Sequence, residues 1–170
     1  MNTFIIAALS ADGFIAKNVD QSSISWRSKF DRDFFIAKTR EAGVVVMGYN
    51  TVKTMRRPMP DRLNIVYSRS DKGLEGFEVT QKPPQELLKD LEARGFSNVA
   101  ICGGGQIYTM FMKAGVVDKI YLTIEPVLFG SGIRLFADDL DIKLDLISVE
   151  KLGESTISLE YDVKKDGKEK

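Results

Sequence analysis

The stretch from Val99 to Tyr108 constrains the fold most, because a short apolar strand here runs into three glycines and then into an apolar helix. Glycines at the end of a strand let the backbone approach a ligand closely, and the following helix presents its free N–H groups to an anion. Gly103, Gly105 and Tyr108 form the pattern G-x-G-x-x-Y, which lacks the third glycine of the dinucleotide-binding fingerprint. The glycines alone therefore fit both an ordinary strand-to-helix turn and a phosphate site.

The same order of strand and helix recurs along most of the chain. Continuous apolar runs predict buried strands at residues 4–9, 44–47, 63–67, 98–102 and 119–127. Apolar residues at helical spacing predict helices at residues 28–42, 52–56, 85–94 and 106–114, with Asn50 or Thr51 as the cap of the second. This alternation predicts an α/β fold with a central, mostly parallel sheet and helices on both faces. Residues 143–152 and 156–163 predict a C-terminal antiparallel strand pair.

Length and composition limit the organisation of the chain and its chemistry. The 170 residues, 44% of them hydrophobic, are expected to form a single domain over residues 1–163, and residues 164–170 are expected to be a charged, frayed tail. Lysine and arginine together balance aspartate and glutamate at 24 each, which argues against a nucleic-acid partner. The single cysteine, Cys102, excludes a disulfide framework, and the absence of histidine excludes Ser-His triads and His-ligated zinc. We expect no metal site.

Residues 1–10 lack a basic leader region, and no run approaches the 18 or so apolar residues of a membrane span. We therefore expect a soluble, cytoplasmic protein with no membrane partner.

Asp31 has two interpretations. Ser28-x-x-Asp31 is a variant of the capping box, in which the acidic residue accepts the first backbone N–H of a helix. Alternatively, Asp31 lies with Phe34 and Phe35 in an apolar pocket and binds a ligand's amidine-like edge through two oxygens. Burial there would raise the pKa of the carboxyl group, whereas a cationic ligand would lower it.

Other polar residues follow predicted strands or turns and are equally open to two interpretations. Arg62 is either an exposed turn residue or a guanidinium that binds a carboxylate bidentately. Thr51, Ser68 and Arg69 are either helix caps and solvent-exposed residues or residues that bind phosphate groups. Trp26 is either a core residue or part of a site.

The order and spacing of these residues resemble the dihydrofolate reductase family over about residues 3–136. Asp31 follows Trp26 by five residues, and Phe35 and Thr39 follow at intervals of four. The further matching motifs are Ile6-Ala-Ala-Leu, Asp12-x-x-Ile15, Met47-Gly-x-x-Thr51, Arg57-Pro-x-Pro-x-Arg62-x-Asn-Ile-Val, Ser68-Arg69, Gly103-Gly-Gly-Gln-Ile-Tyr108 and Asp118-x-Ile-Tyr-Leu-Thr123. The resemblance implies an NADPH-dependent reduction of 7,8-dihydrofolate to tetrahydrofolate by hydride transfer.

The resemblance also implies roles for individual residues. Asp31 would bind the pterin ring and act in catalysis with Trp26 and Thr123, and Arg62 would bind the glutamyl α-carboxylate. The substrate-binding residues would be Ile6, Ala8, Asp31, Phe35, Met55, Arg62, Cys102 and Thr123. The residues binding NADPH would be Ala8, Ile15, Gly48, Tyr49, Asn50, Thr51, Ser68, Arg69, Cys102, Gly103, Gly104, Gly105, Gln106, Ile107 and Tyr108. In the family the first Gly–Gly bond is cis, and residues 16–25 would close over the nicotinamide.

The sequence departs from this family in several places. Tyr49 stands where the family usually has a basic residue, which leaves Arg69 to favour NADPH over NADH. An acidic residue expected in the later loop is missing, and the loop before Trp26 is about three residues longer than in compact bacterial members. Residues 124–136 and 8–16 are more similar to the reductase domain of riboflavin biosynthesis, a relative of the same fold.

Two alternative functions therefore stay open. The first is a riboflavin-type reductase acting on a ribosylamino-pyrimidine. The second is a non-catalytic nucleotide-binding module. The protein is expected to be a monomer or a homodimer that binds a small-molecule folate, and nothing in the sequence separates these two oligomeric states.

Overall fold

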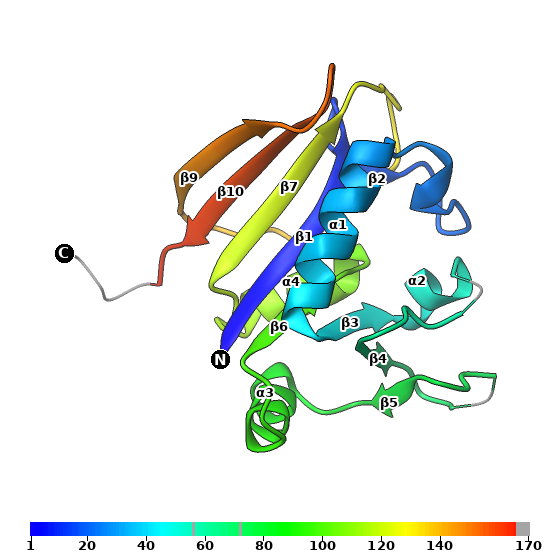
Figure 1. Ribbon diagram of the computed structural model, residues 1–170, viewed down its shortest axis with the longest axis vertical. Helices are drawn as coiled ribbons and strands as arrows, with labels where there is room; N and C mark the ends of the chain where they lie inside the picture. Colours follow the sequence, from blue (N-terminus) through cyan, green and yellow to red (C-terminus); the bar gives the residue numbers. More distant parts are fainter. Residues whose placement is uncertain (56, 72, 166–170) are drawn as a thin grey trace.

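The apolar runs form one eight-stranded sheet in the computed structural model, which describes residues 1–55, 57–71 and 73–165 (Figure 1). The strand order across the described sheet is β5 (Glu78–Thr80), β4 (Leu63–Tyr67), β3 (Val44–Gly48), β6 (Asn98–Ile101), β1 (Asn2–Ser10), β7 (Lys119–Glu125), β10 (Ile157–Val163) and β9 (Leu144–Lys151). The described helices are α1 (Lys29–Ala42), α2 (Tyr49–Lys53), α3 (Pro84–Ala93) and α4 (Gly105–Lys113). The sequence-based prediction of an α/β fold is confirmed.

Six neighbouring strands, from β5 to β7, are parallel, and β1 lies between β6 and β7. Ile5 pairs with Ile101 on one side of β1, and Ala8 pairs with Thr123 on the other. This central position explains why β1 is continuously apolar, since both of its faces are covered. It also brings the carboxyl ends of β1, β3 and β6 to one edge of the sheet, where ligands bind in sheets of this kind.

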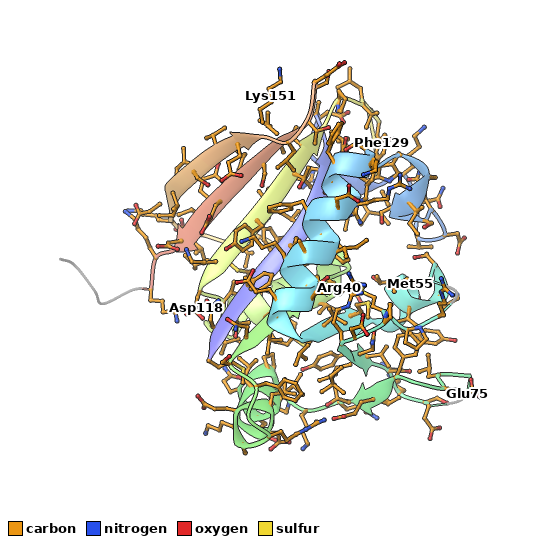
Figure 2. All side chains as sticks on the ribbon, viewed as in Figure 1. Arg40, Met55, Glu75, Asp118, Phe129 and Lys151 are labelled. Carbon is orange, nitrogen blue, oxygen red and sulfur yellow. The ribbon has the colours of Figure 1, made fainter. Side chains whose placement is uncertain are left out.

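Helices cover both faces of the sheet, as the alternation predicts. In Figure 1, α1 lies on the near face and α4 on the far face. Alternate residues of β3 divide between two hydrophobic clusters: Val44 and Val46 pack with Phe111 of α4, whereas Val45 and Met47 pack with Ala42 at the end of α1. The two layers of side chains fill the space between sheet and helices (Figure 2).

The short second helix begins earlier than predicted. α2 starts at Tyr49, and its N-cap is Gly48, so neither Asn50 nor Thr51 caps it. Both predicted caps lie inside the helix because the chain turns directly after β3, with Gly48 still extended at φ −88°. The helix also ends earlier than predicted, at Lys53 with Thr54 as its C-cap, and the predicted last residue, Arg56, lies outside the described residues.

Short elements escape a pattern-based prediction. β5, β2 (Phe14–Ala16) and β8 (Ile133–Arg134) have at most three residues each, and the turn η1 (Ser23–Ser25) interrupts the predicted polar loop. β2 and β8 form a small antiparallel sheet of their own. None of these elements is long enough to show an apolar period.

The predicted C-terminal antiparallel pair is confirmed, and it extends the main sheet through β10 and β7. Ile147 is a bulge in β9, because Ser148 pairs with Glu160 while Leu146 pairs with Tyr161. Leu146 and Val149 of this edge strand are 55% and 58% exposed. Beyond β10, Lys164 and Lys165 form ion pairs with Asp145 and Asp118, and the rest of the expected tail, residues 166–170, lies outside the described part of the chain.

No helix among the described residues combines the length and the apolar character that crossing a membrane requires.

Candidate active site

The two glycine junctions meet at the carboxyl edge of the sheet. The Gly48 N–H donates to the Gly103 carbonyl oxygen over 2.7 Å, and the Cys102 N–H donates to the Val46 carbonyl oxygen over 2.8 Å. α2 begins after Gly48 and α4 after Gly104, and neither glycine has a side chain that could accept a hydrogen bond from the first N–H groups of its helix. Two helix N-termini with free N–H groups therefore lie side by side, which is the arrangement that binds a phosphate group.

Only small residues fit this turn. A Cβ on Gly48 would lie 2.9 Å from Ile107 Cγ1, and a Cβ on Gly103 would lie 2.8 Å from the ring of Tyr108. Gly103 also has φ +100°, and the peptide bond from Gly103 to Gly104 is cis, as the family resemblance implies. Tyr108 is buried, and its hydroxyl donates to the Ile6 carbonyl oxygen over 2.9 Å. Its ring is therefore fixed in the core against the glycine turn.

Several of the other predicted cofactor residues lie at the surface near the two helix starts, whereas Ile107 is buried. A Cβ on Gly104 would lie 3.5 Å from Thr51 Oγ1, an ordinary contact, so the space between the two helix starts, here called the cradle, has room for a methyl group at this position. Tyr49, Asn50 and Gln106 are exposed. Ser68 and Arg69 follow β4, the strand next to β3, and Ser68 Oγ donates to the Ser70 carbonyl oxygen over 2.7 Å. These residues fit a nicotinamide dinucleotide: the glycine turn would hold its pyrophosphate, and Arg69 a 2′-phosphate.

Asp31 lies in the first turn of α1 and is only 2% exposed. The capping interpretation is half correct: Ser28 Oγ accepts the Asp31 N–H over 3.1 Å, but the Ser28 N–H donates to Glu125 Oε1 over 3.0 Å instead of to Asp31. A carboxylate from β7 has taken the place that the capping box would give Asp31. The Asp31 carboxyl group is therefore directed elsewhere.

The partner of the Asp31 carboxyl group is Arg27. Arg27 Nε donates to Asp31 Oδ2, and the guanidinium carbon lies 4.9 Å from the centre of the Phe35 ring. Sequence reasoning missed Arg27, since it precedes the N-cap Ser28 and shows no helical period. The only available signal was its separation of four residues from Asp31, which places opposite charges together when the chain turns helically.

The environment of Asp31 raises the pKa of its carboxyl group. Burial is the largest cause, and it is opposed by the charge and hydrogen bond of Arg27 and by a hydrogen bond from the Thr123 hydroxyl. The nearby Glu125 carboxylate adds to the increase. Asp31 and Thr123, two of the residues to which the family resemblance gives a catalytic role, are thus joined by a hydrogen bond.

Apolar residues predicted to line the substrate pocket lie on the α1 side of the sheet, the side from which α1 carries Asp31. Ile6 is buried in the cluster on the α1 side of the sheet, and Phe35, Met55 and Cys102 pack against that cluster. Burial raises the pKa of the Cys102 thiol to about 12, so the thiol stays protonated and uncharged. Ile15 packs against the opposite cluster, on the α4 side, and so lies apart from these four.

Trp26 lies between the polar loop and α1. Its ring meets Phe129 edge to face at 5.1 Å, and Figure 2 shows Phe129 beside the start of α1. Its buried Nε1 has no hydrogen-bond partner in the described part of the chain. Such an orphaned donor is available to a ligand or to water.

Arg62 is fixed against α1. Its Nη1 donates to Thr39 Oγ1 over 2.6 Å and its Nε donates to the Pro60 carbonyl oxygen over 2.9 Å. Thr39 Oγ1 in turn donates to the Phe35 carbonyl oxygen over 2.7 Å. The guanidinium is held through Thr39, one helical turn from Phe35, and is half-buried, which suits a carboxylate partner.

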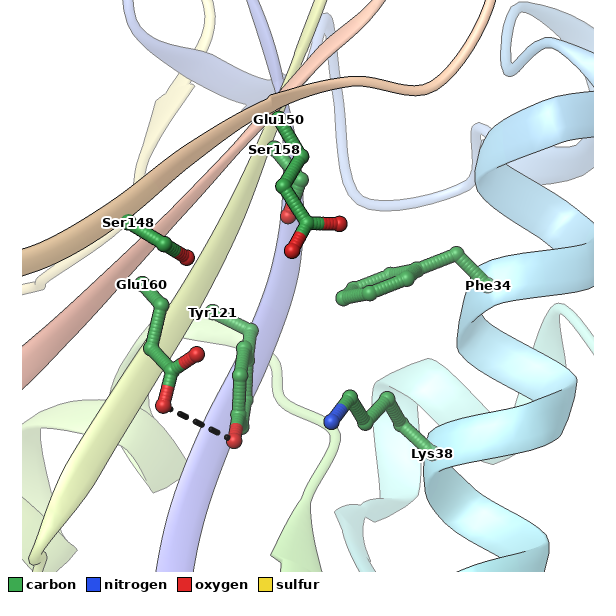
Figure 3. Close-up of a pocket in the computed structure, with 7 residues that line it drawn as sticks. All are labelled: Phe34, Lys38, Tyr121, Ser148, Glu150, Ser158 and Glu160. Atoms are coloured by element: carbon green, nitrogen blue, oxygen red, sulfur yellow. Dashed lines mark hydrogen bonds between the residues drawn. The ribbon is translucent and has the colours of Figure 1, made fainter.

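Two cavities lie away from these residues. The smaller, of about 70 Å³, lies between α1 and the strands β7, β10 and β9 (Figure 3). It is lined by Phe34, Lys38, Tyr121, Ser148, Glu150, Ser158 and Glu160. The larger, of about 510 Å³, lies beside β2 and β8 and includes Asp12 and Arg134. Neither contains Asp31 or the glycine turn.

Comparison with known proteins identifies the family. The family model described as "Dihydrofolate reductase" matches residues 2–127. The chain belongs to the dihydrofolate reductase family. It is 35% identical over 122 residues to the type 3 dihydrofolate reductase of Salmonella typhimurium, covering 70% of this chain and 68% of that one.

Solved structures share this fold within and beyond dihydrofolate reductases proper. A putative riboflavin biosynthesis protein from Shewanella sp. PV-4 has a TM-score of 0.80 at 24% identity, covering 97% of this chain and 100% of that one. Dihydrofolate reductase from Enterococcus faecalis, complexed with NADP(H) and RAB-propyl, has a TM-score of 0.76 at 24% identity, covering 96% and 97%. Family and fold together support an NADP-dependent oxidoreductase of the dihydrofolate-reductase-like superfamily that acts on a small molecule.

Proposed function

We propose that the protein reduces 7,8-dihydrofolate to tetrahydrofolate with NADPH. The observation that carries the proposal is Asp31: a buried carboxyl group with a raised pKa, joined to Thr123, on the helix that covers the apolar cluster of Ile6, Phe35, Met55 and Cys102. An apolar wall with one convergent acid is suited to a flat, polar-edged ring. The family membership supports the same substrate.

This chain's residues would bind and orient the two reactants. The bound nicotinamide cofactor would supply a hydride to C6 of the dihydropterin, with a proton reaching N5. Asp31 would hold the pterin ring, Trp26 Nε1 would bind water or the ring, and Arg62 would bind the glutamyl α-carboxylate. Gly48 and Gly103–Gly105 would hold the pyrophosphate. Alignment of the two rings would supply much of the rate.

Asp31→Asn tests the role of the acid. Oxidation of NADPH in the presence of dihydrofolate should fall by about 100-fold or more, because the ring loses its charged anchor. Asp33→Asn is the matched control: Asp33 is exposed on the same helix and pairs with Lys29, so its loss should leave the rate unchanged. Full activity in Asp31→Asn would refute the assignment.

Arg62→Ala tests the carboxylate site. The KM for dihydrofolate should rise by about ten-fold or more with a smaller change in kcat, since a charge-assisted hydrogen-bond pair is lost. Arg32→Ala removes an exposed arginine of α1 and serves as the control. An unchanged KM in Arg62→Ala would contradict the glutamate assignment.

A riboflavin-type reductase is the second candidate. The likeness to the Shewanella protein and the similarity of residues 124–136 to that domain favour it. The same NADPH assay with a ribosylamino-pyrimidine in place of dihydrofolate separates the two: turnover of the pyrimidine alone would replace our proposal. Binding of NADPH without turnover of either compound would instead identify a non-catalytic nucleotide-binding module.

A further inference from the structure

Arg27 contributes a donor to the site where the proposed ring would bind. Its Nε donates to Asp31 Oδ2 and its Nη1 to Ser23 Oγ over 3.4 Å, while its guanidinium lies over the Phe35 ring. The side chains of Arg27 and Asp31 are 10% and 3% exposed, so the pair is largely shielded from water. The guanidinium is thus held in the ring subsite by an acid, a hydroxyl and an aromatic face.

This pair changes which ring edge the subsite can recognise. A lone carboxylate only accepts hydrogen bonds, and it therefore matches a ring edge that presents two donors. Arg27 has further N–H groups besides those bonded to Asp31 and Ser23, so the pair can offer a ligand an acceptor beside a donor. The complementary ring edge has an N–H, which Asp31 accepts, next to a carbonyl oxygen, to which Arg27 donates. If the ring carries an amino group in place of that carbonyl, the amino N–H faces the Arg27 N–H. A buried donor without an acceptor makes the free energy of binding less favourable.

We propose that Arg27 is a specificity-determining residue, which selects rings carrying a carbonyl beside the N–H bound by Asp31 and disfavours rings carrying an amino group there. The inference rests on the proposed function only in placing a heterocyclic ring at Asp31. Both candidate substrates are oxo-substituted rings, so the selection holds whichever of them is reduced.

Two pteridines that differ at one ring position test the selection. The probes are 2-amino-4-oxopteridine and 2,4-diaminopteridine, with binding measured by calorimetry and by quenching of Trp26, the single tryptophan. The wild-type protein should bind the oxo compound at least about ten-fold more tightly, in line with a hydrogen bond to a charged group. Asp31→Asn should weaken both probes.

Variants of Arg27 assign the selection to its donor. Arg27→Met, of similar length and without a donor, should reduce the preference about ten-fold or reverse it, and Arg27→Lys should restore much of it. Arg32→Met, at an exposed position of α1, should bind both probes as the wild type does. Retained NADPH binding and circular dichroism show that each variant is folded.

Three results would overturn the inference. They are a wild-type preference for the diamino compound, an unchanged ratio in folded Arg27→Met, and probe binding that Asp31→Asn leaves intact. The wild-type measurement stands on its own if Arg27→Met does not fold. Failure of the proposed function is distinguishable, because a protein that keeps the oxo preference but does not turn over dihydrofolate refutes only that function.

Discussion

At Gly104 the backbone leaves room that a methyl group would take from a ligand. The nearest atom to an added Cβ is Thr51 Oγ1 at 3.5 Å, an ordinary contact, and the φ of −76° suits any residue. Gly104→Ala should therefore change the free energy of unfolding by about 1 kcal/mol or less. It should raise the Kd for NADPH by about ten-fold or more, because the methyl group enters the cradle between the helix starts. Urea unfolding and cofactor titration measure the two effects.

Gly103→Ala is the contrasting variant at the next residue. This variant should destabilise the fold itself by about 2 kcal/mol or more. The backbone at residue 103 has a φ of +100°, and the added Cβ would lie 2.8 Å from the Tyr108 ring. Equal effects of the two variants on stability would contradict the distinction between a residue that shapes the turn and one that leaves space for the cofactor.

At the same scale, sequence spacing finds some site residues and misses others. Asp31 is predictable because its intervals to Trp26, Phe35 and Thr39 follow the family pattern. Arg27 and Glu125 are not, because neither lies within a periodic face that bears the site. Ser28 meets Glu125 from 97 residues away, and only the pairing of strands brings them together. The roles of the predicted site residues stay predictions.

At the level of elements, Glu125 anchors the start of α1. Its side chain is 1% exposed and accepts from the Ser28 N–H, from Ser28 Oγ over 2.9 Å and from Thr156 Oγ1 over 3.1 Å. Thr156 lies just before β10, so one carboxylate joins β7, α1 and the C-terminal strand pair. This explains how the first turn of α1, which carries Asp31, is fixed to the sheet.

Glu125→Gln should lower the free energy of unfolding by about 1–3 kcal/mol, because the amide nitrogen would face one of these donors. Amide hydrogen exchange should accelerate in the first turn of α1 more than in α3. Glu154→Gln, an exposed position in the turn between β9 and β10, is the control and should change neither measurement. A Glu125→Gln protein as stable as the wild type would show that the anchor is dispensable.

Asp12 joins the turn after β1 to the loop after β7. The Ser10 hydroxyl and the N–H groups of Gly130 and Phe129 donate to its carboxylate and lower its pKa to about 2. Because the pKa is lower folded than unfolded, the stabilisation is present above about pH 4 and is lost as the pH falls from about 4 to about 2.

The stability difference between the wild type and Asp12→Asn should therefore shrink as the pH falls through this window. Thermal unfolding of both proteins at neutral pH and at several values down to about pH 2 measures it. Asp20→Asn, in the exposed loop, should show no such convergence. A difference that is constant with pH would refute the role of the Asp12 carboxylate.

At the scale of the whole molecule, the proposed cofactor site joins distant parts of the chain. Gly48 ends β3, whereas Ser68 and Gly103 come after β4 and β6 of the same sheet. A ligand that binds only the folded chain at 100 times its Kd adds about 2.7 kcal/mol to its stability. NADPH at that excess should raise the Tm by about 5–10 °C.

NADH at the same concentration should give a smaller rise, because it lacks the 2′-phosphate assigned to Arg69. Arg69→Ala should reduce the NADPH rise to that of NADH without altering the Tm of the free protein. An equal increase in Tm with both cofactors in the wild type would show that Arg69 does not bind the 2′-phosphate. Scanning calorimetry or dye-based unfolding measures all of these values.

The architecture was more predictable from sequence than the detail within it. Long apolar runs, such as those that form β1 and β3, predict strands that are buried on both faces. Strands of this kind are typical of a central parallel sheet. Strands of two or three residues, such as β2 and β8, carry no period, and their pairing depends on the loops that meet there. The start of α2 at Tyr49 likewise depends on where β3 ends, not on the capping preference of Asn50 or Thr51.

The bulge at Ile147 has a consequence for solubility during synthesis and storage. β9 is the last strand of the sheet. One row of its backbone N–H and C=O groups therefore has no neighbouring strand among the described residues. Exposed apolar side chains lie beside that row. A regular edge of this kind recruits further strands and seeds aggregation. The extra residue breaks the regular spacing of the row, and the charges of Asp145 and Lys151 stand near its two ends. Removing Ile147 would restore an even edge and favour fibre-like aggregates over the soluble chain.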